Sequence, residues 1–173
     1  AKLDGCTQDP KWHPEGDEWV HTMFVCDAAA LIADREGLTG EDRATIILSA
    51  LCHDLGKALP VNGGTTAFED GRWRSRGHAE AGVPLAERFL KRIGCFDRII
   101  HRVLPLVAEH MISASNDVSE RTVRRLSSRM GAATIRELLL IIEADHNGRP
   151  PLPGGLPKSA LFIAETATKL DLG

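Results

Sequence analysis

The sequence lacks several features that would place it in a specialised class of protein. It has no tyrosine, aromatic residues make up only 5% of it, and no apolar run approaches the roughly 18 residues of a membrane-spanning helix. The net charge of −3 gives no overall basic field for nucleic acid or an anionic membrane. We therefore expect no membrane association, and we expect any phosphorylated substrate to bind at a local site.

The cysteines also lack a recognisable motif. Cys6, Cys26, Cys52 and Cys95 are far apart, and none forms a CxxC pair. The first residues contain no apolar segment typical of a signal peptide. We expect reduced thiols and a cytoplasmic location, with structural disulfides as the alternative.

What the sequence does contain is helical periodicity. Its 173 residues, 43% of them hydrophobic, suffice for one domain with a core. Apolar spacing, caps and glycine breaks predict helices over residues 18–36, 39–54, 78–93, 97–112, 119–128, 132–145 and 157–170. Asp70-Gly71 between two alternating segments predicts a hairpin, and residues 58–65 should form a loop. The expected class is all-α with one small β-hairpin, in a single domain of residues 1–173.

Two details of these helices matter for the site. Asp17 should cap the first helix, whose buried face we expect to contain Val20, Phe24, Ala28, Leu31 and Ile32, with His21 on or beside it. Thr39 with Asp42 resembles a capping box at the second helix. The apolar runs 44–51 and 138–142 predict that their two helices are central.

Six ionisable residues lie near helix ends or on inward faces: His21, His53, Asp54, His78, His110 and Asp145. Buried polar groups of this kind are costly unless they are paired or bind a metal. Four imidazoles and two carboxylates suit Mn, Fe, Co, Ni or Zn better than Mg or Ca. Six ligands exceed one tetrahedral site and would fit two ions with a bridging carboxylate. The alternative is a set of unrelated, satisfied core residues.

In order and context these residues resemble the HD superfamily of metal-dependent phosphohydrolases. The resemblance is closest to the HD domain of bacterial CCA-adding tRNA nucleotidyltransferases, and it extends to the HD modules of RNA-end-repair enzymes fused to polynucleotide kinase. The matching segments are residues 8–17, His21-Thr22, 51–57, 77–83, 107–110, 143–145 and 148–149.

The resemblance implies an HD-domain helical bundle that hydrolyses phosphoesters of nucleotides or RNA ends. The implied activities are 2′,3′-cyclic phosphodiesterase, 2′-nucleotidase and phosphatase. No nucleotidyltransferase segment precedes residue 8 in this sequence, so we expect the HD activity alone, with fusion to or association with a kinase or nucleotidyltransferase module as the partner. The alternatives are a nucleoside monophosphate or deoxynucleotide phosphatase and a non-catalytic nucleic-acid-binding HD module.

We assign roles to the six residues on this basis. His21, His53, Asp54 and Asp145 are predicted to hold one divalent ion, and Asp54 to bridge to a second ion completed by His78 and His110. The two ions, Mn, Ni, Co or Fe sooner than Mg, would activate a water as hydroxide for in-line attack on phosphorus. Asp54 and Lys57 are the predicted catalytic residues.

The predicted substrate contacts surround this centre. Lys57, after the flexible Gly56, should bind the substrate phosphate; the alternative is a surface lysine. Further predicted contacts come from His13, Glu15, Arg74, Arg76 and Arg149, although a solvated hairpin explains Arg74 and Arg76 equally well. A helical face with Arg121, Arg124, Arg125 and Arg129 is better explained by solvation than by RNA binding.

Overall fold

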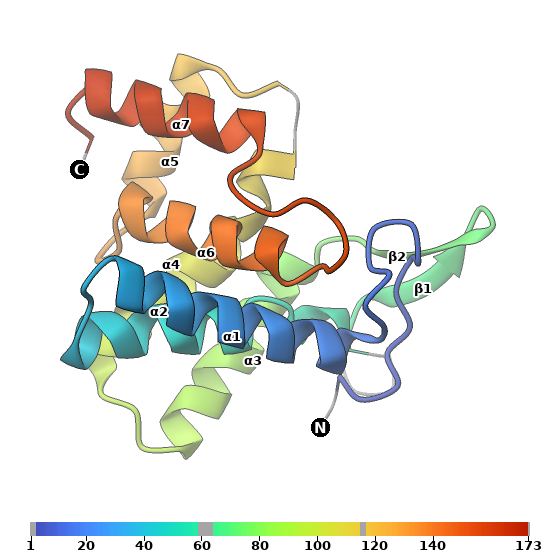
Figure 1. Ribbon diagram of the computed structural model, residues 1–173. Helices are drawn as coiled ribbons and strands as arrows, with labels where there is room; N and C mark the ends of the chain where they lie inside the picture. The colour runs from blue at the N-terminus through green and yellow to red at the C-terminus, as the bar shows by residue number, and fades with distance from the viewer. Residues whose placement is uncertain (1–2, 59–63, 115–116, 173) are drawn as a thin grey trace.

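The computed structural model describes residues 3–58, 64–114 and 117–172, and within these ranges it is a bundle of helices with one two-stranded hairpin (Figure 1). The predicted all-α class is therefore confirmed. The elements are α1 (Glu18–Arg35), α2 (Gly40–Cys52), β1 (Thr66–Glu69), β2 (Arg72–Ser75), α3 (His78–Arg92), α4 (Asp97–Glu109), α5 (Glu120–Arg129), α6 (Ile135–Asn147) and α7 (Lys158–Lys169). Short 3₁₀ helices follow α2 at Leu55–Lys57 and α4 at His110–Ala114.

Two further expectations concern membrane spanning and the state of the cysteines. In the described part of the chain, no helix is both long and apolar enough to cross a membrane. All four cysteines are free, as expected. Most of the loop predicted for residues 58–65 lies outside the described residues.

The hairpin has the predicted strands and turn. Glu69 pairs with Arg72 and Phe68 with Trp73, and the latter two rings meet edge to face at 5.3 Å. Asp70 and Gly71 both have positive φ, at 50° and 76°, which is the requirement of a type I′ turn.

The helix ends differ from the sequence prediction in ways that affect the site. Asp17 caps α1 as predicted, because its Oδ1 accepts from the Val20 N–H at 3.0 Å. The capping box predicted at Thr39 is wrong, since Thr39 makes no side-chain cap. α6 begins at Ile135, three residues later than predicted, because Thr134 and Glu137 form a capping box that the apolar pattern concealed.

Helices α2 and α6 lie inside the bundle, as their apolar runs predict. Leu138, Ile141 and Ile142 of α6 are fully buried and share one hydrophobic cluster with Ile46 and Ala50 of α2. A second cluster joins the end of α2 to α3 and α4. α2 thus contributes to both clusters, and its C-terminal end lies between α1, α3 and α4.

The buried face predicted for α1 is wrong in part. Val20, Phe24 and Leu31 are exposed, Leu31 to 71%, and the face against α2 and α6 contains instead Glu18, His21, Val25, Ala29 and Ile32. Apolar periodicity misplaced the face because three buried positions at the start of the helix, Glu18, His21 and Thr22, are polar.

A close backbone contact brings the end of α2 to the start of α3. A Cβ at Gly56 would overlap the His78 carbonyl oxygen, and Gly82 faces Gly56 across the same contact. Only glycine at position 56 lets His78 lie beside the turn that contains Asp54. Glycine is therefore needed at position 56 because the two backbone segments approach closely, and not because of unusual backbone angles.

We expect Gly56→Ala to destabilise the protein by about 3 kcal/mol, the upper end for overpacking, because the atoms in the way are backbone atoms. Gly131→Ala is the control: Gly131 has φ +57° and open space around it, so it should cost only about 1–2 kcal/mol of backbone strain. Urea denaturation measures both. A Gly56→Ala loss no larger than that of the control would contradict the proposed role of this contact.

Candidate metal centre

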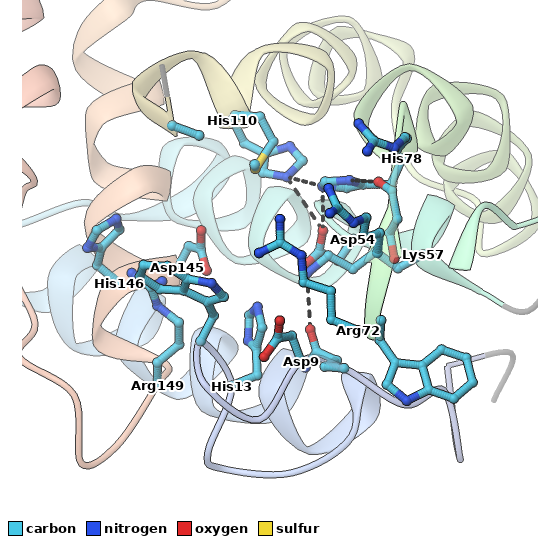
Figure 2. A pocket seen from close by; sticks show the side chains of 18 of the residues that line it. Asp9, His13, Asp54, Lys57, Arg72, His78, His110, Asp145, His146 and Arg149 are labelled. Carbon is cyan, nitrogen blue, oxygen red and sulfur yellow. Dashed lines mark hydrogen bonds and ion pairs between the residues drawn. The ribbon is translucent and has the colours of Figure 1, made fainter. Parts of the chain in front are cut away.

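The structure brings all six predicted ligand side chains to one place at the ends of five helices. Figure 2 shows Asp54, His78, His110 and Asp145 where they face the cavity. His21 comes from α1, and His53 and Asp54 come from the turn after α2. His78 is the first residue of α3, His110 follows α4, and Asp145 lies near the end of α6. Because α3 and α4 pack side by side, His78 and His110 face each other, as their positions predict.

Three imidazoles are oriented by the backbone in the same way. The Nδ1 atoms of His53, His78 and His110 each donate at 2.7 Å to the carbonyl oxygen of the residue three positions earlier. A carbonyl only accepts, so the proton must be on Nδ1. In the neutral rings the Nε2 lone pairs therefore point into the cluster, the orientation that a metal-binding histidine needs.

Asp54 lies between two groups of imidazoles and has one carboxylate oxygen toward each. Its Oδ2 is 2.9 Å from Nε2 of His53 and 3.9 Å from Nε2 of His21. Its Oδ1 is 3.1 Å from Nε2 of His78 and 3.5 Å from Nε2 of His110. A carboxylate in this position can bridge two cations.

His21 is held from both sides by acids. Its Nε2 is 3.1 Å from Asp145 Oδ1, and its Nδ1 is 2.7 Å from Glu15 Oε1. Burial opposes the charged ring, but the close contacts with the carboxylates of Asp145 and Glu15 outweigh burial and raise the pKa of His21 to about 10. The same contact with His21 lowers the pKa of Asp145 despite its burial.

Several polar atoms in this cluster lack a hydrogen bond. His21 Nε2, His53 Nε2 and Asp54 Oδ1 are buried, and their contacts with ionisable neighbours, at 3.1, 2.9 and 3.1 Å, lack the geometry of a hydrogen bond. Nε2 of His78 lies only 3.2 Å from Nε2 of His110. Two imidazole lone pairs at that distance repel unless a proton or a cation lies between them. The donor set, nitrogen and carboxylate oxygen, together with these unsatisfied atoms, fits divalent transition metal ions.

Lys57 faces this cluster and is not a surface lysine. Its Nζ is 2.7 Å from Asp54 Oδ2, 3.3 Å from Glu18 Oε2 and 3.1 Å from Gln8 Oε1. Burial opposes its charge, but Asp54 and Glu18 outweigh burial and raise its pKa, so it remains an ammonium ion.

A cavity of about 560 Å³ opens onto the cluster and contacts most of the predicted substrate residues. His13, Lys57, Arg74, Arg76 and Arg149 line it. Glu15 does not: its side chain is fully buried, between Nδ1 of His13 and Nδ1 of His21. The prediction for Glu15 therefore needs correction, because its position suits orienting His21 and not contacting substrate.

Sequence reasoning missed Glu18, Arg72 and His146. Glu18 is fully buried, and burial first, then Asp54, raises its pKa. Its spacing of three from His21 was the available signal, because residues i and i+3 share a helical face. Arg72 and His146 line the cavity, but nothing in the sequence distinguishes them from surface residues.

An ion bound at His21 should compete with a proton. Because the pKa of His21 is raised to about 10, its ring is protonated at neutral pH when no ion is present, and binding at Nε2 must release that proton. We expect Mn²⁺ affinity to rise about tenfold for each unit by which the pH is raised, up to a pH of about 10. Calorimetry in buffers of different ionisation enthalpy measures the released proton. Affinity independent of pH would contradict this, and His21→Gln should abolish the release.

Comparison with known proteins agrees with the resemblance seen in the sequence. A family model described as HD domain matches residues 19–149. A protein named Multifunctional CCA protein from Pasteurella multocida is 30% identical over 155 residues, which cover 86% of this chain and 34% of that protein. The protein of the same name from Cupriavidus metallidurans is 33% identical over 153 residues, covering 86% of this chain and 33% of its own.

The chain spans about a third of the length of these relatives. No solved structure matched it. The family model, however, covers most of the chain and includes all six clustered residues. This protein therefore belongs to the HD domain family, and this family is of the metal-dependent phosphohydrolase type.

Proposed function

We propose that this HD domain is a divalent-metal phosphohydrolase acting on phosphoesters of nucleotides or RNA ends. The proposed activities are 2′,3′-cyclic phosphodiesterase, 2′-nucleotidase and phosphatase. The observation that supports this best is the position of Asp54, whose two carboxylate oxygens face two separate pairs of imidazoles.

Each residue has a role consistent with its place. His21, His53 and Asp145 would hold one ion with Asp54, and His78 and His110 would hold a second. Bound ions of this kind neutralise phosphate charge and lower the pKa of water from 15.7 to about 7, which supplies a nucleophile at neutral pH. Mn, Ni, Co and Fe suit the nitrogen-rich donor set better than Mg.

The remaining residues bind the substrate or orient the imidazole rings. Glu15 fixes the ring of His21, and the carbonyls of the preceding turns fix the other three imidazoles. Lys57 donates to a phosphate oxygen at the cavity side of Asp54. His13 lines the cavity, and burial first, then Lys57 and His21, lower its pKa to about 4, so it is neutral at pH 7.

The decisive experiment compares hydrolysis of adenosine 2′,3′-cyclic phosphate with hydrolysis of adenosine 5′-phosphate by the Mn²⁺-loaded protein in single-turnover assays. We expect the cyclic ester to be opened, and Asp54→Asn to slow this by at least about 10³-fold, since it removes a ligand from both ions. His110→Gln should reduce the metal content from two ions to one. The control is His101→Gln, at an exposed position on α4.

Two results would contradict the proposal. Hydrolysis of the 5′-phosphate without any activity on the cyclic ester would favour a nucleoside monophosphate phosphatase. Full activity in Asp54→Asn would exclude this cluster as the catalytic centre.

Lys57 should act on substrate without holding the ions. We expect Lys57→Met to lower kcat/KM by about 10²–10³-fold, the effect of losing one donor to a charged oxygen, while the metal content stays unchanged. Because the substitution leaves Glu18 buried without its cation, the double variant Lys57→Met/Glu18→Gln is the matched control for misfolding. Metal that is lost in Lys57→Met and retained in the double variant would show that Lys57 only compensates the charge of Glu18 and is a structural residue.

A further inference from the structure

Most arginines outside the cavity are neutralised by acidic neighbours. Seven of them form ion pairs with glutamate or aspartate: Arg35, Arg43, Arg98, Arg102, Arg124, Arg129 and Arg136. This pairing is expected in a chain of net charge −3. In the described ranges the other arginines outside the cavity form no ion pair, and they are Arg88, Arg92, Arg121 and Arg125.

The arginines that line the cavity are different. In the described ranges, Arg72 and Arg149 form no ion pair, and the Nε atoms of Arg74 and Arg149 are buried without a hydrogen-bond partner. Arg74 makes only a 3.5 Å contact with exposed Asp70. Arg76 differs from the other cavity arginines, because it forms an ion pair with Glu69 at 3.1 Å. The cavity is therefore the place where unneutralised guanidinium groups converge.

The hairpin arranges three of these groups in a row. Side chains alternate along a strand, so Arg72 and Arg74 of β2 project from the same face, and Arg76 follows the strand. Figure 2 shows the side chain of Arg72 extending across the cavity in front of Asp54, toward the side where Arg149 and His146 lie. Figure 1 shows that the hairpin projects away from the helices. The row thus leads from the metal cluster outward.

The reacting phosphate does not need this row. Lys57 and the proposed ions already supply positive charge where that phosphate binds, and the cavity is much larger than one phosphate group. The cavity also contacts two of the three tryptophans of an aromatic-poor chain, and one of them, Trp12, is 51% exposed. An exposed indole beside guanidinium groups is a combination that binds single-stranded nucleic acid by stacking and by charge.

We propose that the arginine row, defined as Arg72, Arg74 and Arg76, binds the phosphodiester on the 5′ side of the terminal nucleotide, so that the substrate is the end of an oligonucleotide and not a free mononucleotide. This inference rests on the proposed phosphohydrolase function and specifies its substrate. Trp12 provides the surface on which a neighbouring base stacks.

The first test compares three substrates with the same scissile group. These are adenosine 2′,3′-cyclic phosphate, the same compound with a 5′-phosphate, and the dinucleotide ApA with a terminal 2′,3′-cyclic phosphate. We expect kcat/KM for the dinucleotide to exceed that for the first compound at least about tenfold, the effect of one charge-assisted hydrogen bond. If the 5′-phosphorylated mononucleotide equals the dinucleotide, the row binds a terminal phosphate and the oligonucleotide assignment is overturned.

The second test removes two of the three arginines of the row. In Arg72→Gln/Arg74→Gln the ratio of dinucleotide to mononucleotide kcat/KM should fall to about 1, as expected if the second phosphate has lost its charge-assisted bonds. The matched control is Arg121→Gln/Arg125→Gln, which removes two exposed arginines of α5 that do not line the cavity. An unchanged ratio in the hairpin variant, or a reduced ratio in the α5 variant, would overturn the proposal.

The third test does not depend on hydrolysis. Binding of 5′-fluorescein-labelled tri-adenylate with a 2′,3′-cyclic end is followed by anisotropy without added metal at several salt concentrations. Each phosphate contact contributes about 0.7 to the slope of log K against log salt for a single strand, so the hairpin variant should have a slope shallower by at least that amount. An equal slope contradicts the arginine row. A protein that binds with the expected slope but hydrolyses none of the three substrates would contradict the proposed function and leave the row supported.

Discussion

The buried charge of Asp54 is the constraint on which the arrangement of this molecule depends. Its side chain is 2% exposed, and an ionised carboxylate in such a place is very costly unless cations or hydrogen bonds compensate it. Burial opposes ionisation, but His53 and Lys57 outweigh burial and hold the pKa of Asp54 well below its usual range. Four imidazoles and one ammonium group surround it, and each comes from a different turn or helix end. Compensating this one charge therefore requires the ends of several helices to meet.

The helix ends also supply the groups that orient the imidazoles. The last carbonyls of a helix have no partner within it, and His53 and His110, directly after α2 and α4, each donate to one such carbonyl. His78 uses the end of strand β2 in the same way. A histidine one residue beyond a helix therefore satisfies an orphan carbonyl and directs its Nε2 atom outward along the helix. This explains why the cluster forms at ends and not along helical faces.

The same logic explains which parts of the site the sequence could predict. Residue type and position near predicted helix ends suffice for His53, Asp54, His78 and His110, because helix ends can be located from caps, glycines and apolar runs. Glu18 was missed for a different reason: it is a buried polar residue at the start of α1, and the apolar stripe of Val20, Phe24 and Leu31 pointed to the wrong face. Glu15 lies before α1, where no helical pattern indicates that its side chain is buried against His21. The contribution of Arg72 depends on where the hairpin packs, which no local pattern determines.

Glu18 gives Lys57 a position that does not depend on Asp54 alone. If Asp54 were its only acidic partner, any cation that bound Asp54 would compete with Lys57 and release the ammonium group. Glu18 Oε2 at 3.3 Å and Gln8 Oε1 at 3.1 Å instead give Nζ two contacts that do not involve Asp54. A buried pair adds little stability after desolvation, so Glu18 is better explained by placement than by fold stability. The ammonium group can then remain at the cavity while Asp54 interacts with other cations, and one small site can offer both a metal-binding carboxylate and a fixed phosphate-binding lysine.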